Sequence, residues 1–336
     1  MKKAIFAVII TILFLLAAAS PVSAGLTEWA AVSEGDSQIV TMASVTPDDT
    51  YYKVMQKKPF DLMAITDAWD VTAGSSDIIV AVVDSGVDAS HPDLQGNVLA
   101  TGYNFVDNNT DTSDVNGHGT MIAGIIAATV DNTAGIAGAT QNCLILPVRV
   151  LDANGNGTVA NMAAGIRYAA DNGARVINLS LGCPSYDKAL EDAVNYADAL
   201  GVVVVAASGN TGGAVQYPAA CTNAIAVGAV TNAGAFASYS NYGEKQALVA
   251  VGSSVFTTNF SAGKHGYAVA TGTSFAAPFV SALAALVLSE NDALTPDAVA
   301  DIMEKTATDL GNAGHDPYYG YGCVNFKAAV TLAQVG

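Results

Sequence analysis

Short runs of consecutive apolar residues alternate with longer apolar stretches along most of this chain. Continuous apolar runs of strand length are typical of strands buried on both faces of a sheet, and the longer stretches between them have the length of helices. The pattern predicts strands over residues 77–84, 143–150, 175–181, 201–207 and 224–230, and helices over 121–130, 158–172, 188–200, 274–288, 298–307 and 325–335. This alternation indicates an α/β fold with a mostly parallel central sheet and helices on both faces.

The N-terminal residues follow a different pattern. Lys2 and Lys3 form a short basic start, residues 4–19 are an almost unbroken apolar run, and small residues follow at 22–24. These are the features of a secretory signal peptide at residues 1–24. A membrane anchor is the alternative, although the run is short for a full span. We therefore expect a secreted, extracellular protein without membrane contact once the signal is removed, because no later segment resembles a membrane helix.

Composition indicates a globular protein with a sizeable core. Residues 25–45 are polar and aperiodic, so we interpret them as a linker or short pro-segment before one domain at residues 46–336. Of the 336 residues, 51% are hydrophobic and 13% are charged, which is too apolar for a disordered chain. Asp and Glu number 30 against 13 Lys and Arg, a net charge of −17. This acidic balance argues against binding to nucleic acid or acidic lipid, and we expect a monomer.

The cysteines leave more than one interpretation open. Cys143, Cys183, Cys221 and Cys323 form an even set, which in an exported protein permits two disulfides. Four buried free thiols are the alternative. Four cysteines allow three pairings, and their positions alone do not select one. No spacing among them is typical of a zinc site.

Candidate chemistry lies where predicted strands end and predicted helices begin. Asp84 ends the first strand as Val-Val-Asp-Ser-Gly, and His118 precedes a helix in Asn-Gly-His-Gly-Thr. Asn210 follows the valine-rich strand in Ser-Gly-Asn, and Ser274 begins the most apolar helix in Gly-Thr-Ser-Phe-Ala-Ala-Pro. Sites in open parallel sheets lie beyond the carboxyl ends of the strands, so these side chains are expected to meet.

These four residue types are those that acyl transfer requires. A serine hydroxyl needs an adjacent base, histidine is a base near neutral pH, and a carboxylate orients the imidazole. An amide donor stabilises the oxyanion of the tetrahedral intermediate. Each residue alone has an ordinary explanation as a turn former, a loop residue or a helix cap. It is the combination that predicts a catalytic site.

With these segments the chain resembles the subtilisin-like serine proteases, or subtilases, and among them the thermitase-like, secreted microbial branch. The resemblance runs from about Thr46 to the C-terminus, and the order Asp, His, Ser is that of subtilisin. It implies a subtilisin-like three-layer sandwich and a serine endopeptidase that hydrolyses polypeptide substrates through an acyl-enzyme. By resemblance Ser274 is the nucleophile, His118 the base, Asp84 its orienting carboxylate and Asn210 the oxyanion donor.

The resemblance also implies a substrate groove. Its edge strand and the walls and end of its main side-chain pocket would be formed by Ser180, Leu181, Gly182, Ala206, Ala207, Ser208, Gly209 and Gln216. Pairing of an extended substrate with an edge strand is tolerant of substrate sequence. Cys183 and Cys221 would be neighbours at this pocket, which implies a disulfide between them. The long propeptide usual in the family has no counterpart here.

A structural calcium ion is a further implication of the resemblance. The implied ligands are the side chains of Asp49, Asp93 and Asn132 and the carbonyls of Val130, Ala134 and Ile136. An all-oxygen shell of this kind suits Ca²⁺. Solvated turn acids are the alternative interpretation. A second site around Asp107, Asn109 and Asp111 has weaker support.

Three other classes of protein compete with this interpretation. Residues 155–160 match the dinucleotide fingerprint G-x-G-x-x-A, which would indicate an oxidoreductase, but they do not follow the first strand. Residues 272–276 lack the last glycine of the G-x-S-x-G motif of α/β-hydrolase esterases, and the order of the triad is wrong for that fold. A protease-shaped binding module is the third, and it is disfavoured because all four catalytic residue types are present.

Overall fold

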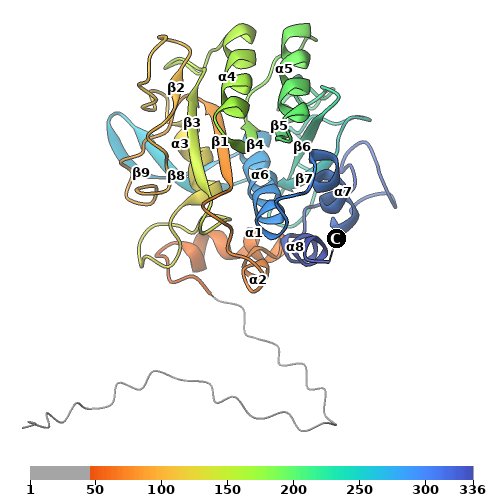
Figure 1. The fold of residues 1–336 in the computed structure, drawn as a ribbon. Helices are drawn as coiled ribbons and strands as arrows, with labels where there is room; N and C mark the ends of the chain where they lie inside the picture. The colour runs from red at the N-terminus through yellow and green to blue at the C-terminus, as the bar shows by residue number, and fades with distance from the viewer. Residues whose placement is uncertain (1–45, 336) are drawn as a thin grey trace, which may run out of the picture. The chain divides into compact units, whose positions relative to one another are not determined.

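The computed structural model describes residues 46–335, so the predicted signal peptide at 1–24 and the segment at 25–45 lie outside the described residues. A seven-stranded sheet has the order β2-β3-β1-β4-β5-β6-β7, and every neighbouring pair is parallel (Figure 1). The strands are β1 (Ile79–Asp84), β2 (Tyr103–Asn104), β3 (Leu144–Arg149), β4 (Ala174–Leu179), β5 (Val203–Ala207), β6 (Ala224–Val230) and β7 (Leu248–Val251). The predicted α/β class with a mostly parallel sheet is confirmed.

Helices cover both faces of this sheet. Helices α3 (His118–Ala127) and α6 (Thr273–Glu290) pack on one face, and α4 (Val159–Asp171) and α5 (Lys188–Ala199) pack on the other (Figure 1). Along β1, Val80 and Val82 belong to the first core, whereas Ala81 and Val83 belong to the second. Because both faces are buried, the strand sequence is continuously apolar instead of alternating.

The remaining elements frame this three-layer core. An N-terminal π-helix η1 (Tyr52–Gln56) leads into α1 (Lys57–Leu62) and α2 (Ile65–Ala68). Strands β8 (Val255–Ser261) and β9 (Lys264–Ala270) form an antiparallel hairpin, and α7 (Pro296–Thr306) and α8 (Phe326–Ala333) complete the chain. The hydrophobic pattern did not predict β2, β7, the hairpin or the N-terminal helices.

Two helix boundaries differ from the prediction in a way that matters for the site. Helix α3 begins at His118 instead of Met121, because Gly117 adopts a left-handed φ of 101° and caps it. It ends at Ala127, so Val130 lies in the following loop. Helix α6 begins at Thr273, which makes Ser274 its second residue.

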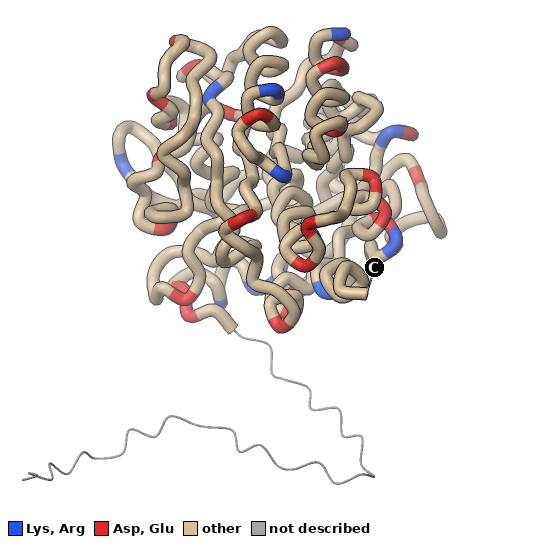
Figure 2. Tube along the Cα trace, viewed as in Figure 1, with Lys and Arg blue, Asp and Glu red and all other residues tan. Residues whose placement is uncertain are grey.

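Helix α6 is long and apolar enough to cross a membrane by composition, but 83% of it is buried in the protein, so it is a core helix. In the part of the chain from 46 to 335, Lys and Arg positions lie scattered between the more numerous acidic positions (Figure 2).

Candidate active site

Asp84 and His118 are brought together at the carboxyl end of β1. Asp84 is the last residue of β1 and is fully buried, and Nδ1 of His118 lies 2.8 Å and 2.9 Å from its two carboxylate oxygens. A carboxylate accepts hydrogen bonds, so Nδ1 carries the proton and Nε2 is left as the basic nitrogen. The close approach depends on Gly119, where a Cβ would collide with the carbonyl oxygen of Gly86.

The environment of His118 favours its charged form. Burial by itself lowers the pKa of the imidazole, but the negative charges of Asp84 and Asp114 and the hydrogen bond to Asp84 outweigh burial and raise the pKa above its usual value of 6.5. The imidazolium that forms when a base takes a proton is therefore stabilised here.

Ser274 lies beside this pair at the N-terminus of α6. The ring of its neighbour Phe275 is 5.5 Å from the imidazole of His118, centroid to centroid. Among the described residues, the hydrogen-bond partner of the Ser274 hydroxyl is the carbonyl of Ser180, at 3.1 Å, and no hydrogen bond joins it to His118. Catalytic hydrogen bonds are often loose without substrate and tighten when it binds.

Asn210 follows β5 and faces the start of α6. Its Oδ1 accepts hydrogen bonds from the backbone N–H of Thr273 at 2.7 Å and from the Thr273 hydroxyl at 3.0 Å. These two donors fix the orientation of the amide and leave Nδ2 to donate elsewhere. The N–H of Ser274 lies in the first turn of the same helix, where N–H groups lack partners within the helix.

Two adjoining cavities run from these residues. One of about 230 Å³ is lined by Leu181, Gly182, Ala207, Gly209, Asn210, Thr211, Gln216, Thr273 and Ser274. Another of about 450 Å³ is lined by Asn116, His118, Leu151, Asn154, Gly155, Asn156, Gly157, Val159, Met162, Ser180, Leu181, Gly182 and Cys183. Of the predicted substrate-binding residues, Ala206 and Ser208 line neither cavity. Ala206 packs into the core on the face that α4 and α5 cover, and the Ser208 hydroxyl donates to the carbonyl of Asn241 at 3.3 Å.

Several of these lining residues were not predicted from the sequence. The loop Gly155–Gly157, which matched a dinucleotide fingerprint, forms a wall of the larger cavity. The signal was present in the position of this loop between the end of β3 and the start of α4, but the glycine spacing pointed to a different ligand.

The implied disulfide between Cys183 and Cys221 is not formed, and all four cysteines are free thiols. The two segments are held together instead by a pair of backbone hydrogen bonds between Cys183 and Tyr217, at 2.8 Å and 3.0 Å. Cys221 is buried, and burial together with the neighbouring Glu191 raises the pKa of its thiol.

The residues implied as calcium ligands gather around the loop after α3. Asp93 is fully buried and accepts hydrogen bonds from Asn132 Nδ2 at 3.0 Å, Ile136 N at 2.9 Å and Tyr267 Oη at 3.0 Å. Oδ1 of Asn132 accepts from Ala134 N at 2.8 Å. Both side chains therefore stabilise the loop itself.

Asp49 presents the clearest free ligand atom. It is 3% exposed, its Oδ2 accepts from the N–H of Asp131, and its Oδ1 has no hydrogen-bond partner within residues 46–335. Ligand oxygens of Asp48, Asp49 and Asp131 lie within 4.8 Å of one another. Burial and the charge of Asp131 raise the pKa of Asp49 despite opposing backbone hydrogen bonds. Three converging carboxylates with an unpartnered buried oxygen fit a hard cation. Asp48 and Asp131 were not among the predicted ligands.

The residues of the second implied calcium site, around Asp107, Asn109 and Asp111, contact other groups of the protein. Asp107 forms an ion pair with Arg149 at 3.3 Å, and Asn109 Oδ1 accepts from the N–H of Asp111. These contacts satisfy the groups within the protein itself.

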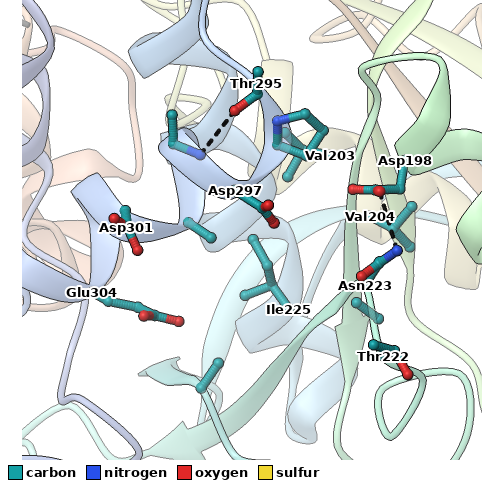
Figure 3. Close-up of a pocket in the computed structure, with 15 residues that line it drawn as sticks. Asp198, Val203, Val204, Thr222, Asn223, Ile225, Thr295, Asp297, Asp301 and Glu304 are labelled. Carbon is teal, nitrogen blue, oxygen red and sulfur yellow. Dashed lines mark hydrogen bonds between the residues drawn. The ribbon is translucent and has the colours of Figure 1, made fainter.

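Figure 3 shows a further cavity, of about 600 Å³. It is bounded by α7 and by the first residues of β5 and β6. It therefore lies at the amino ends of the strands, whereas Asp84 and Asn210 lie at their carboxyl ends. Four acidic side chains line it: Asp198, Asp297, Asp301 and Glu304. It is larger than the two cavities beside His118 and Ser274, but none of Asp84, His118, Asn210 and Ser274 lines it.

Three features meet at the carboxyl ends of the strands of this parallel sheet: a buried Asp–His pair, a serine at a helix N-terminus and an oriented amide donor. Together they define an α/β serine hydrolase. The subtilase family matches residues 75–322. The chain belongs to the subtilase family, and it is a serine endopeptidase. Membership excludes the oxidoreductase and esterase alternatives.

Its relatives include several proteases. A thermophilic serine proteinase of Bacillus sp. (strain AK1) is 48% identical over 291 residues, which span 86% of this chain and 70% of that protein. Thermitase of Thermoactinomyces vulgaris is 43% identical over 286 residues, or 85% of this chain and 99% of that protein. A solved structure of a protease from Pseudoalteromonas arctica has a TM-score of 0.78 at 29% identity and covers 86% of this chain and 100% of its own.

Proposed function

We propose that Ser274 attacks the carbonyl carbon of the scissile peptide bond while Nε2 of His118 takes the hydroxyl proton. Asp84 keeps the proton of the imidazole on Nδ1 and stabilises the imidazolium. The amide of Asn210 and the N–H of Ser274 donate to the oxyanion. The imidazolium then protonates the leaving amine, and a water molecule releases the acyl group by the same steps. The observation that carries this proposal is the 2.8 Å contact between His118 Nδ1 and Asp84 beside the start of α6.

Substitution of the nucleophile tests this assignment. Ser274→Ala should lower kcat by about 10⁶, the loss known for subtilisin, without unfolding the protein. Phenylmethylsulfonyl fluoride should label Ser274 and no other serine, as peptide mass spectrometry would show. Ser261→Ala, at an exposed serine of β8, is the matched control and should keep full activity. Retention of more than about 1% of activity by Ser274→Ala would contradict the assignment.

We propose that an extended polypeptide binds along Ser180, Leu181 and Gly182, with one side chain in the cavity of about 230 Å³. Support comes from the position of this segment between the two cavities, both of which it lines. The side-chain amide of Gln216 lies near Gly182 and Gly209, so it shortens this cavity and offers hydrogen bonds. A peptide-library cleavage profile would test which substrate side chain the cavity accepts.

We propose that a calcium ion joins the N-terminal segment to the loop 130–136, with Asp49 as a ligand. The other implied ligands remain predictions: the carbonyls of Val130, Ala134 and Ile136, and the side chains of Asp93 and Asn132. The unpartnered Oδ1 of buried Asp49 supports the proposal. So do the backbone contacts between the two segments, such as Tyr51 N to Gly135 O at 2.9 Å. The ion would supply positive charge that stabilises the fold and takes no part in the reaction.

We propose that residues 1–24 are removed during export and that residues 46–336 form the peptidase domain of a secreted monomer. The basic, apolar and small-residue pattern of the N-terminus supports export. N-terminal sequencing of the protein from culture medium tests the processing, and size-exclusion chromatography with light scattering tests the monomer. A mature chain beginning at Met1 would contradict the first, and a stable dimer would contradict the second.

A further inference from the structure

Asp114 is a buried carboxylate that the catalytic assignment does not use. It lies four residues before His118, in the loop that leads into α3, and it is 4% exposed. Among the described residues, no Lys, Arg or His forms an ion pair with it. A buried charge without a cation needs hydrogen bonds, so its contacts show what it holds in place.

The two oxygens of Asp114 accept five hydrogen bonds. Oδ1 accepts from the Ser85 hydroxyl at 2.8 Å, Asn116 N at 3.0 Å and Gly117 N at 2.8 Å. Oδ2 accepts from the backbone N–H of Thr120 at 2.9 Å and from its hydroxyl at 2.6 Å. Four of these donors belong to the turn that begins α3, and the fifth belongs to the residue directly after Asp84.

Ser85 extends this connection to both members of the Asp–His pair. Its backbone N–H donates to Asp84 Oδ1 at 2.7 Å, and its hydroxyl accepts from Gly119 N at 3.0 Å. Asp84 is therefore tied to Asp114 through one residue, and Asp114 is tied directly to the turn that carries His118. The negative charge of Asp114 also reaches His118, whose pKa it helps to raise.

We propose that Asp114 is a positioning residue of this peptidase. Its carboxylate holds the residue after Asp84 and the start of the helix that carries His118 in fixed relative positions, and its negative charge stabilises the imidazolium of His118. The inference rests on the proposed roles of Asp84 and His118. Geometry of this kind matters because reacting groups tolerate little misplacement. Hydrogen-bond partners that orient the ligands of metal sites are worth about 10- to 100-fold in activity, and we expect an effect of the same order here.

Asp114→Asn tests both parts of the proposal. The amide keeps one acceptor oxygen, removes the charge, and turns an N–H₂ group toward donors that need an acceptor. With a short peptide p-nitroanilide, kcat should fall about 10- to 100-fold while KM changes less. Loss of the charge should also move the acid limb of the kcat/KM profile to lower pH, because Asp84 then remains as the one nearby anion that favours the imidazolium.

Asp316→Asn is the matched control for a purely structural effect. Asp316 is 3% exposed and accepts from the N–H groups of Asn312, Tyr318 and Tyr319, far from the groove in sequence and outside its lining. Its substitution should lower Tm but leave kcat and the pH profile unchanged. If Asp114→Asn likewise lowers only Tm, with kcat within about twofold and an unmoved acid limb, the proposal is wrong.

Two further variants keep the result unambiguous. If Asp114→Asn does not fold, Ser85→Ala breaks the connection but keeps the charge. It should lower kcat about 10- to 100-fold, the range for loss of one hydrogen bond to a charged group, without moving the acid limb. An unchanged kcat for Ser85→Ala would overturn the positioning role. Asp84→Asn, measured in parallel, distinguishes failure of the positioning role of Asp114 from failure of the proposed roles of Asp84 and His118. If Asp84→Asn keeps wild-type kcat, the proposed catalytic roles fail as well.

Discussion

Removal of calcium should destabilise this protein through the carboxylate of Asp49. That side chain is 3% exposed, and its Oδ1 has no hydrogen-bond partner among the described residues. Leaving a buried acceptor unsatisfied costs about 1–3 kcal/mol, and more when it is charged. The nearby carboxylates of Asp48 and Asp131 are exposed, so solvent screens their repulsion and they add little.

This cost converts to a measurable shift in thermal stability. With about 2.1 cal/mol/K of unfolding entropy per residue, a domain of 290 residues changes its Tm by about 1.6 °C per kcal/mol, so excess EDTA should lower Tm by about 2–5 °C at neutral pH. A ligand present at about 100 times its Kd contributes about 2.7 kcal/mol, which is of the same order. Scanning calorimetry on the Ser274→Ala variant would avoid self-digestion during heating.

The shift should also depend on pH. Burial raises the pKa of Asp49 above its ordinary value of 3.8, so the folded protein binds this proton more tightly than the unfolded chain does. Without calcium, the destabilisation is therefore fully present above the raised pKa and disappears as the pH falls toward 3.8. The difference in Tm with and without EDTA should shrink over that range.

A matched pair of variants identifies the carboxylate responsible. Asp49→Asn removes the charge, so its Tm in EDTA should equal or exceed that of the parent, and calcium should no longer raise it. Asp77→Asn, at an exposed aspartate before β1, should keep the full calcium shift. If EDTA leaves the parent Tm unchanged at neutral pH, and calorimetry detects no binding of calcium to chelated protein, the reasoning is refuted.

The catalytic site supports four further predictions. Asn210→Ala should lower kcat by about 10²–10³ with little change in KM, the loss known for an oxyanion donor in subtilisin, and an unchanged kcat would count against its role. The raised pKa of His118 should place the acid limb of the kcat/KM profile above pH 6.5, since the neutral imidazole is the active base; a midpoint below that value would contradict the assigned environment. Gln216→Gly should deepen the cavity and shift a peptide-library profile toward larger side chains, and an unaltered profile would show that Gln216 does not close it. In native protein iodoacetamide should alkylate the partly exposed Cys183 before the three buried cysteines, and peptide mapping that finds Cys183 in a disulfide would contradict the free thiol.

The apolar pattern predicted the central architecture because burial on both faces of a parallel sheet leaves a local signature. Strands β1 and β5 lie where continuous apolar runs indicated them, and α4 and α5 match the predicted helices within one residue at each end. Strands β2 and β7 escaped prediction because one has two residues and the other has four, too short for a distinctive pattern. The hairpin of β8 and β9 is partly exposed and mixes polar with apolar residues, so its pairing depends on contacts distant in sequence.

The chain by itself predicted the chemistry of the site: a carboxylate, a base, a nucleophile and an amide donor, each expected at a strand end or helix start where a parallel sheet collects such residues. Tertiary structure alone decided which atoms engage. It shows the amide of Asn210 oriented by Thr273, the thiols of Cys183 and Cys221 unpaired, and Asp49 grouped with Asp48 and Asp131. It also shows Asp114 buried between Ser85 and the start of α3. The physical reason is that hydrogen bonds and burial depend on the relative positions of segments distant in sequence, and the spacing of residues along the chain does not encode those positions.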